Sequence, residues 1–222
     1  KLLALGGLGY AGYRYYEKNR VDRNGVAFAD GQPEGQFRDA GAAATGALAA
    51  TASFAQDDKL DTLPDLTGQA ILITGTSSGF GRRASELFAR AGATVFATMR
   101  NTPRPEADEL QQLARDEGLD IRVLRLDVLL DDEVAEAIAT AEREIGRGID
   151  VLVNNAGVVL NADVEDTSLE KYRWVNSVMS DGVFLGCKHA IPLMNKGDGG
   201  SIVNMSSTGA LLGYPIFFAY SA

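Results

Sequence analysis

Residues 70–81 have the sequence AILITGTSSGFG, in which a short apolar run leads directly into a loop rich in glycine. Such a run, bounded by turn residues, is typical of a strand that is buried on both faces. The residues that follow, 79–90, have the pattern of a helix. A strand that passes through a glycine-rich turn into a helix is the context that a dinucleotide-binding turn requires.

The chain after residue 60 continues to alternate short β-branched runs with amphipathic stretches. Strands of this kind, separated by helices, need crossover connections and build a parallel sheet that is covered on both faces. The predicted fold class is therefore α/β, with a doubly wound parallel sheet. The expected strands are 70–73, 93–99, 121–126, 151–153 and 201–205, and the expected helices are 79–90, 106–117, 131–145 and 181–194, with a helical region opening at 167.

Two of the expected helices have specific start signals. Asp131 directly precedes a pattern with an apolar face and is the expected N-cap of helix 131–145. Thr167 is followed three residues later by Glu170, which is the spacing of a capping box. We therefore expect the next helical region to open at Thr167.

Residues 1–60 differ in composition from residues 61–222, which hold the α/β domain. We predict an irregular or partly helical N-terminal extension, with a helix over residues 2–19 followed by a Gly/Ala-rich linker. The apolar run at 2–13 is shorter than the roughly 20 residues that a membrane span needs. The expected location is cytoplasmic, and peripheral membrane contact by this segment is left open.

Overall composition excludes several classes of function. The formal net charge of -9 argues against nucleic-acid binding, which needs a basic surface. Cys187 is the single cysteine and His189 the single histidine, so no intrachain disulfide and no multi-histidine metal cluster is expected. Ordinary packing or surface roles are expected for both, and no metal site is predicted.

The glycines of the loop after the first strand have distinct expected roles. Gly75 permits a tight turn, Gly79 lets the backbone approach a pyrophosphate, and Gly81 allows close packing of helix against strand. The N-terminus of the following helix favours an anion through its free N–H groups and its dipole. Taken alone, the glycines could also serve only as a turn.

The order of motifs along the chain resembles the short-chain dehydrogenase/reductase family, in its single-domain NAD(P)-dependent branch. The T-G-x-x-x-G-x-G spacing at 74–81 and the N-N-A-G segment at 154–157 match the family pattern. The resemblance extends over residues 66–222 and implies a Rossmann-like fold. It implies that the cofactor is bound by Gly75, Ser77, Ser78, Gly79, Phe80, Gly81, Arg100, Asp127, Val128, Asn154, Ala156 and Gly157.

The resemblance also implies a catalytic set made of Asn176, Ser207 and Tyr220. Tyr220 would be the acid/base, Ser207 would hydrogen-bond the substrate oxygen, and Asn176 would order a relay water. Each residue also has a structural role as its alternative; Asn176, for example, could hydrogen-bond to neighbouring backbone groups within a helix. The implied substrate is a carbonyl or alcohol compound, and Gly79-Phe80-Gly81 is similar to members that act on lipophilic compounds.

The family's Tyr-x-x-x-Lys motif would place its lysine at position 224, beyond Ala222. We therefore expect a chain that is truncated after the catalytic tyrosine, is inactive by itself and leaves an exposed sheet edge. A homo-oligomer is expected only for a full-length form. The alternative is a noncatalytic nucleotide-binding or partner-binding module, in which the short form is natural.

Cofactor choice is predicted from the end of the second strand. Met99 stands where NAD-selective members have an acid, and Arg100 follows it. Arg100 could pair with the 2′-phosphate of NADP, with Ser78 donating a hydrogen bond, so NADP(H) is favoured over NAD(H). Arg100 as a solvated loop residue is the alternative. A sugar-nucleotide epimerase is disfavoured by the three-residue spacing between Gly75 and Gly79.

Overall fold

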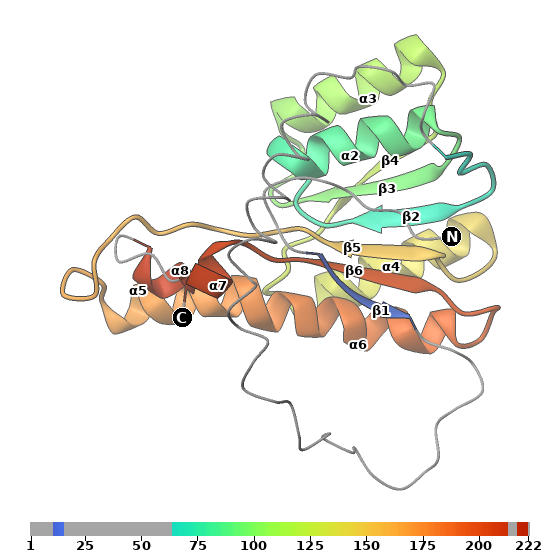
Figure 1. The fold of residues 1–222 in the computed structure, drawn as a ribbon. Coiled ribbons are helices and arrows are strands. Elements are labelled where there is room, and N and C mark those ends of the chain that lie inside the picture. The colour runs from blue at the N-terminus through green and yellow to red at the C-terminus, as the bar shows by residue number, and fades with distance from the viewer. Residues whose placement is uncertain (1–10, 16–63, 213–216, 222) are drawn as a thin grey trace, which may run out of the picture.

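The computed structural model describes residues 11–15, 64–212 and 217–221. They contain a six-stranded sheet in the order β1-β6-β5-β2-β3-β4 (Figure 1). Strands β2 to β6 are parallel to one another, and β1 pairs antiparallel with β6. The predicted doubly wound α/β fold is confirmed. The strands are β1 (Ala11–Tyr15), β2 (Ala70–Ile73), β3 (Thr94–Met99), β4 (Ile121–Arg125), β5 (Val151–Asn154) and β6 (Ser201–Met205).

Helices cover both faces of the sheet (Figure 1). The helix bounds are α2 (Gly79–Arg90), α3 (Pro105–Glu117), α4 (Asp131–Ile145), α5 (Leu169–Asn176), the π-helical turn η3 (Ser177–Asp181), α6 (Gly182–Met194), α7 (Gly209–Leu212) and α8 (Phe218–Ser221). Helices α2 and α3 pack on one face, and α4 and α6 pack on the other. Across the described residues, no helix is both long enough and apolar enough to cross a membrane.

Strand β2 lies at the centre of the sheet and divides its side chains between the two cores. Ile71 and Ile73 pack with the residues of α2 and α3, whereas Ala70 and Leu72 pack with those of α4 and α6. All four are at most 3% exposed. The continuous apolar run in the sequence therefore follows from burial on both faces, as successive strand residues point to opposite sides.

The N-terminal extension departs from the prediction. Residues 11–15, which fall within the helix expected over 2–19, form strand β1 instead, in register from Ala11 opposite Met205 to Tyr15 opposite Ser201. Strand β6 offers unpaired backbone groups to a neighbouring segment, and the two tyrosines of residues 11–15 are of a type that is enriched in strands. Strand β1 thus covers β6 and itself forms the edge of the sheet on that side. The remainder of residues 1–60, including the linker, lies outside the described residues.

Two helix starts lie one residue away from their expected positions. Helix α5 is capped by Ser168, whose hydroxyl accepts the Lys171 N–H at 3.2 Å, while the Thr167 hydroxyl donates to the Asp163 carbonyl. Helix α4 has Leu130 at its N-cap, so Asp131 is its first residue.

The Asp131 carboxylate links helix α4 to helix α6 and does not cap α4. It lies 2.7 Å from His189 Nε2 and 3.0 Å from Lys188 Nζ. The hydrogen bond with His189, followed by that with Lys188, holds the pKa of Asp131 below its usual value. His189 therefore has a surface pairing role, in line with the ordinary role expected for it.

Candidate functional site

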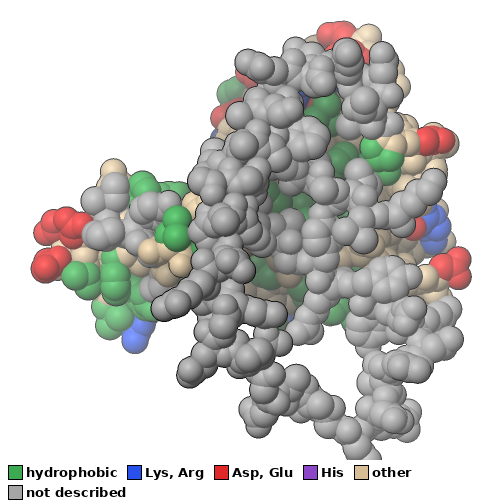
Figure 2. Space-filling view, viewed as in Figure 1, with side chains coloured by type: hydrophobic (Ala, Val, Ile, Leu, Met, Phe, Trp, Pro, Cys, Tyr) green, Lys and Arg blue, Asp and Glu red, His purple; other side chains and the backbone are tan. Residues whose placement is uncertain are grey.

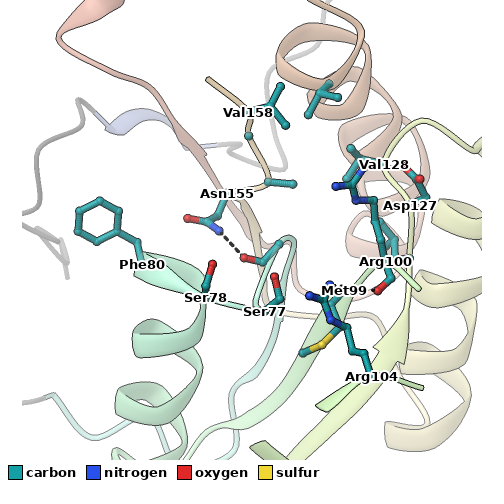
Figure 3. A pocket seen from close by; sticks show the side chains of 15 residues that line it. Ser77, Ser78, Phe80, Met99, Arg100, Arg104, Asp127, Val128, Asn155 and Val158 are labelled. Atoms are coloured by element: carbon teal, nitrogen blue, oxygen red, sulfur yellow. Dashed lines mark hydrogen bonds between the residues drawn. The ribbon is translucent and has the colours of Figure 1, made fainter. Parts of the chain in front are cut away.

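Most of the residues expected to bind a cofactor line one cleft at the carboxyl edge of the parallel strands, and the exceptions are Gly79, Gly81 and Asn154. Loops that follow β2, β3, β4 and β5 enclose a cleft of about 290 Å³ there (Figure 3). Ligands of doubly wound sheets bind at this edge, beside the point where the strand order reverses. The cleft is lined by Gly75, Ser77, Ser78, Phe80, Met99, Arg100, Arg104, Leu126, Asp127, Val128, Asn155, Ala156, Gly157, Val158 and Val178.

Buried threonines join the loop after β2 to the two neighbouring strands. The Thr74 hydroxyl donates to the Val153 carbonyl at 3.4 Å and accepts the N–H groups of Asn155 and Ala156 at 3.0 Å each. On the other side, the Thr76 hydroxyl donates to the Thr98 carbonyl, also at 3.0 Å. The floor of the cleft is therefore fixed by hydrogen bonds from both sides.

The two asparagines of the N-N-A-G segment point to different places. The Asn155 amide lines the cleft and donates to the Thr74 and Gly75 carbonyls at 2.8 and 3.1 Å (Figure 3). Asn154 is 4% exposed, donates to Asn204 Oδ1 at 2.8 Å and does not line the cleft. Asn154 thus joins β5 to β6, while the unpredicted Asn155 holds the glycine-rich loop.

Each glycine of the loop meets a different steric demand. Gly75 has a φ of +70°, and a Cβ there would lie 2.7 Å from the Cα of Ala156. A Cβ on Gly81 would collide with the Gly75 carbonyl oxygen and with Nδ2 of Asn155. At Gly79, with a φ of +59°, a Cβ would meet no atom within 4 Å. Gly75 and Gly81 thus permit close packing, and the open space beside Gly79 would admit a ligand.

The start of helix α2 suits an anion. Ser78 stands at its N-cap without a capping side-chain hydrogen bond, and the first turn contains no acidic residue. The first N–H groups of a helix have no partner within that helix, and they carry the positive end of its dipole. A phosphate group in the cleft would satisfy these donors, so the residues present fit a dinucleotide.

Positive charge lies at the end of the cleft formed after β3. Arg100 and Arg104 both line it beside Met99, and Arg104 makes a bidentate ion pair with Glu106, at 2.8 Å for each bond. The hydrogen bonds from Arg104 lower the pKa of Glu106 to about 2, and the hydrogen bond from the Glu106 backbone N–H is the second-largest cause. Arg104 was absent from the sequence prediction.

Asp127, after β4, supports its own turn and borders the cleft. Its backbone N–H donates to the Glu133 carboxylate at 2.8 Å, and its Oδ1 accepts the Leu129 N–H at 3.0 Å. Asp127 and its neighbour Val128 both line the cleft. A turn residue can therefore also present a carboxylate to a ligand in this fold.

The three candidate catalytic residues lie outside the cleft lining described above. The Ser207 hydroxyl accepts the Gly209 N–H at 3.1 Å, and the Tyr220 ring packs against Gly209 so closely that a Cβ there would lie 3.1 Å from Cε1. Ser207 and Tyr220 thus approach the same residue at the start of α7.

Asn176 ends helix α5 immediately before the π-helical turn η3. Its side-chain amide donates to the Tyr172 carbonyl one turn earlier, at 3.0 Å. This is the alternative to the catalytic role, in which the asparagine side chain bonds to the backbone of its own helix. The Tyr172 ring contacts that of Phe218, with centroids 6.3 Å apart, so α5 packs on α8, the helix that carries Tyr220. π-Helical turns within helices are frequent at functional sites.

Apolar side chains are exposed around these short helices. Figure 2 shows hydrophobic side chains gathered at the end of the molecule that Figure 1 assigns to α5, α7 and α8. Exposed examples are Leu169, Leu211, Leu212 and Phe218. Scattered apolar residues are normal on a protein surface, whereas a gathered group suggests contact with an apolar ligand or partner.

Comparison with known proteins identifies the family. The family model described as short chain dehydrogenase matches residues 69–222, well over half of the chain. The protein is a member of the short-chain dehydrogenase family. The resemblance drawn from the motifs is confirmed, and with it the general assignment as an oxidoreductase.

Two curated relatives illustrate the range of short-chain dehydrogenases to which the chain is similar. An NADP-dependent (R)-specific alcohol dehydrogenase of Lentilactobacillus kefiri is 36% identical over 160 residues, which are 71% of this chain and 61% of the relative. A 3-beta-hydroxysteroid dehydrogenase of Comamonas testosteroni is 34% identical over 157 residues, 71% of this chain and 59% of the relative. The chain thus spans about three fifths of the length of these relatives, 59–61%.

The fold is also similar to that of solved short-chain dehydrogenases. A gluconate 5-dehydrogenase from Burkholderia cenocepacia, solved in complex with NADP and tartrate, has a TM-score of 0.64 and 32% sequence identity. The similarity covers 73% of this chain and 62% of that structure. It supports the Rossmann-like topology independently of the motifs.

Sequence reasoning missed several residues that line the cleft, above all Asn155 and Arg104. Strand alternation could have separated Asn155 from Asn154, since neighbouring strand residues point to opposite sides. For Arg104 the only signal was Pro105, which marks a helix start and restricts the residue before it to an extended backbone. Nothing in the local pattern indicated that this loop returns to the cleft.

Proposed function

We propose that the protein binds NADP(H) in the cleft and transfers hydride between the nicotinamide and a carbonyl or alcohol substrate. The observation that carries the cofactor preference is the residue order after β3. Met99 ends the strand and Arg100 follows it in the cleft lining, so no acid stands there to repel a 2′-phosphate. The NADP named for the Lentilactobacillus and Burkholderia relatives supports the same choice.

In this proposal, different residues of the cleft bind different parts of the cofactor. The N-terminus of α2 and the open space at Gly79 accept the pyrophosphate, because free N–H groups favour an anion. Arg100 forms a charge-assisted fork with the 2′-phosphate, and Ser78 donates a hydrogen bond to it. Asp127 accepts a hydrogen bond from the adenine amino group. Ser77, Phe80, Val128, Ala156 and Gly157 complete the walls.

The catalytic proposal assigns one proton to the protein, since the bound cofactor supplies the hydride. Tyr220 donates a proton to the substrate oxygen in reduction and accepts it in oxidation. Ser207 donates a hydrogen bond to the same oxygen as negative charge develops on it. Asn176, at the start of the π-helical turn, orders a water for proton relay. The shared approach of Ser207 and Tyr220 to Gly209 supports their acting on one atom.

The proposed substrate is a lipophilic carbonyl or alcohol compound. Leu211 and Leu212 are 66% and 65% exposed on α7, the helix that begins two residues after Ser207. Phe218, two residues before Tyr220, is 39% exposed. An apolar substrate would cover these side chains while its polar oxygen meets the hydroxyl groups.

The cofactor half of the proposal is tested by titrating the 222-residue chain with NADPH and with NADH, following nicotinamide fluorescence and thermal stability. Tighter binding of NADPH and a higher melting temperature in its presence are expected. The variant Arg100→Ala is expected to weaken NADPH binding roughly tenfold and to leave NADH binding unchanged, because only NADPH has the 2′-phosphate. An unchanged preference in this variant would refute the role of Arg100.

The catalytic half is tested on the whole protein, because the chain spans 59–61% of its curated relatives. Oxidation of NADPH by a series of ketones of increasing apolar size is followed with Tyr220→Phe as the comparison. Loss of more than about 10²-fold in kcat with unchanged NADPH affinity is expected, since general acid/base groups typically contribute that much. A folded protein that binds neither nicotinamide cofactor would instead favour a noncatalytic module.

A further inference from the structure

Arg104 reaches the cleft because of how its loop is built. After β3 the chain turns at Asn101, which has a φ of +52°, a conformation that asparagine tolerates better than most residues. Arg104 is the N-cap of α3, and Pro105 follows it as the first helical residue. A proline restricts the preceding residue to an extended backbone, and Arg104 has φ and ψ of -157° and 154°. Its backbone direction is therefore fixed before any ligand binds.

The Arg104 side chain is held as firmly as its backbone. Nε and Nη2 each donate to a Glu106 oxygen at 2.8 Å, and Nη1 lies 3.5 Å from the Arg100 carbonyl oxygen. With a pKa of about 2, Glu106 stays ionised at neutral pH. A guanidinium held by a bidentate partner loses less rotamer freedom when it binds a ligand than a free one does.

The two arginines of the cleft point to different parts of it. In Figure 3 the Arg100 side chain extends toward Val128, whereas the Arg104 guanidinium lies toward Met99 and Ser77. A guanidinium has five N–H donors, and the Glu106 pair uses two of them on one edge. Nη1 also donates to the Arg100 carbonyl oxygen, so one hydrogen on Nη1 and one on Nη2 remain for a second acceptor.

We propose that Arg104 is a second recognition residue for the 2′-phosphate, fixed in place by Glu106 and acting together with Arg100. This inference rests on the proposed binding of NADP(H). Its rival is a purely structural role, in which the Arg104–Glu106 pair only closes the loop between β3 and α3. The rival predicts equal effects on both cofactors, because NADH uses the same loop and the same ribose position but lacks the phosphate.

The test measures dissociation constants for NADPH and NADH with the wild-type chain, Arg104→Met, Arg104→Lys and Arg115→Met. Arg115 is the matched control, an exposed arginine of α3 eleven residues from Arg104 and so about 16 Å farther along the helix. Arg104→Met is expected to weaken NADPH binding at least about tenfold and NADH binding less than twofold. Arg115→Met is expected to change neither constant by more than about twofold, because salt screens distant exposed charges.

Arg104→Lys keeps the charge but loses the fork, so a smaller loss for NADPH is expected. Equal weakening of NADPH and NADH by Arg104→Met, or no change in either, would overturn the role of Arg104. A wild-type chain without preference for NADPH would instead refute the proposed cofactor, which separates the two failures. If Arg104→Met does not fold, Arg104→Lys provides the same test. Weaker binding of NADPH but not of NADH would then support the role of Arg104, and equal effects on both would overturn it.

Discussion

Replacing Thr74 with valine tests whether the hydroxyl network behind β2 organises the cleft. The side chain is 4% exposed, and its hydroxyl accepts the N–H groups of Asn155 and Ala156 at 3.0 Å each. Valine has nearly the same shape but cannot accept a hydrogen bond. The variant therefore leaves two backbone donors without this partner while changing little in packing.

The expected loss of stability follows from those two donors. Each donor left unsatisfied in a buried position costs about 1–3 kcal/mol. Asn155 and Ala156 are partly buried, so the lower half of this range applies, and Thr74→Val should lower the free energy of unfolding by about 2–4 kcal/mol. This is a large share of a typical domain's stability of about 5–15 kcal/mol.

The assay is urea denaturation combined with NADPH titration, and Thr98→Val is the matched control. Thr98 is 0% exposed, and its hydroxyl donates one hydrogen bond, to the Ile73 carbonyl at 3.0 Å rather than to the Asn155 loop. The control should lose only about 1 kcal/mol. Thr74→Val should also weaken NADPH binding roughly 2- to 10-fold, because a looser loop must be ordered at a cost of about 0.5–1.5 kcal/mol.

A loss of stability in Thr74→Val no larger than that in Thr98→Val would refute this reasoning. It would mean that the Asn155 and Ala156 donors find other acceptors, such as water, when the hydroxyl is absent. Unchanged NADPH affinity in a clearly destabilised Thr74→Val variant would separate the two claims. In that case the network would stabilise the fold without shaping the cleft.

Three further outcomes follow from the described contacts. Gly75→Ala should lower stability by about 1–2 kcal/mol for its positive φ and by about 1–3 kcal/mol for overlap with Ala156, and a urea midpoint shift equivalent to less than 1 kcal/mol would contradict this. Gly186→Ala should lower the melting temperature although alanine favours helices, since its Cβ would collide with Oδ1 of the buried Asn154; a raised melting temperature would argue against that contact. The folded-state pKa of Glu106 is lowered from 4.5 to about 2, so the ionised carboxylate stabilises the fold fully above about pH 4.5, and this stabilisation is lost as the pH falls toward 2. Glu106→Gln should therefore lose less stability than the wild type across this interval in urea titrations. Parallel pH profiles of the variant and the wild type would count against this role.

The elements that the sequence predicted well are those whose signals are local and strong. The strand at Ala70–Ile73 is flanked by turn residues and is buried on both faces, so its composition alone indicates its place. The order of strands and helices after it followed from periodicity and from the handedness of crossovers. Helix starts were less accurate, because Thr167, Ser168 and Asp131 can all cap a helix, and tertiary partners decide among them.

The N-terminal strand could not be predicted from its own residues. Strand β1 pairs with β6, whose residues lie nearly 200 positions later in the chain. A weakly patterned segment adopts the structure that its partner offers, and a sheet edge offers unpaired N–H and C=O groups. Such long-range pairing leaves no mark on local periodicity.

Side-chain direction limited the prediction of the site in the same way. Asn154 pairs with Asn204 on the neighbouring strand, and only strand order shows that the two are adjacent. Arg104 enters the cleft because of the path of residues 100–104, which depends on one positive φ and on Pro105. Motif matching identifies residues along the chain, whereas the lining of a cleft depends on where each loop returns.

The candidate site consists of two parts that differ in how they are held. The cleft proposed to bind the cofactor rests on central strands joined by buried hydrogen bonds from Thr74 and Thr76. Ser207 and Tyr220, by contrast, meet at Gly209 through short helices of four residues each. Short helices have little stability of their own and depend on tertiary packing. Cofactor binding should therefore withstand changes in α7 and α8 that abolish proton transfer, so binding and catalysis need to be measured separately.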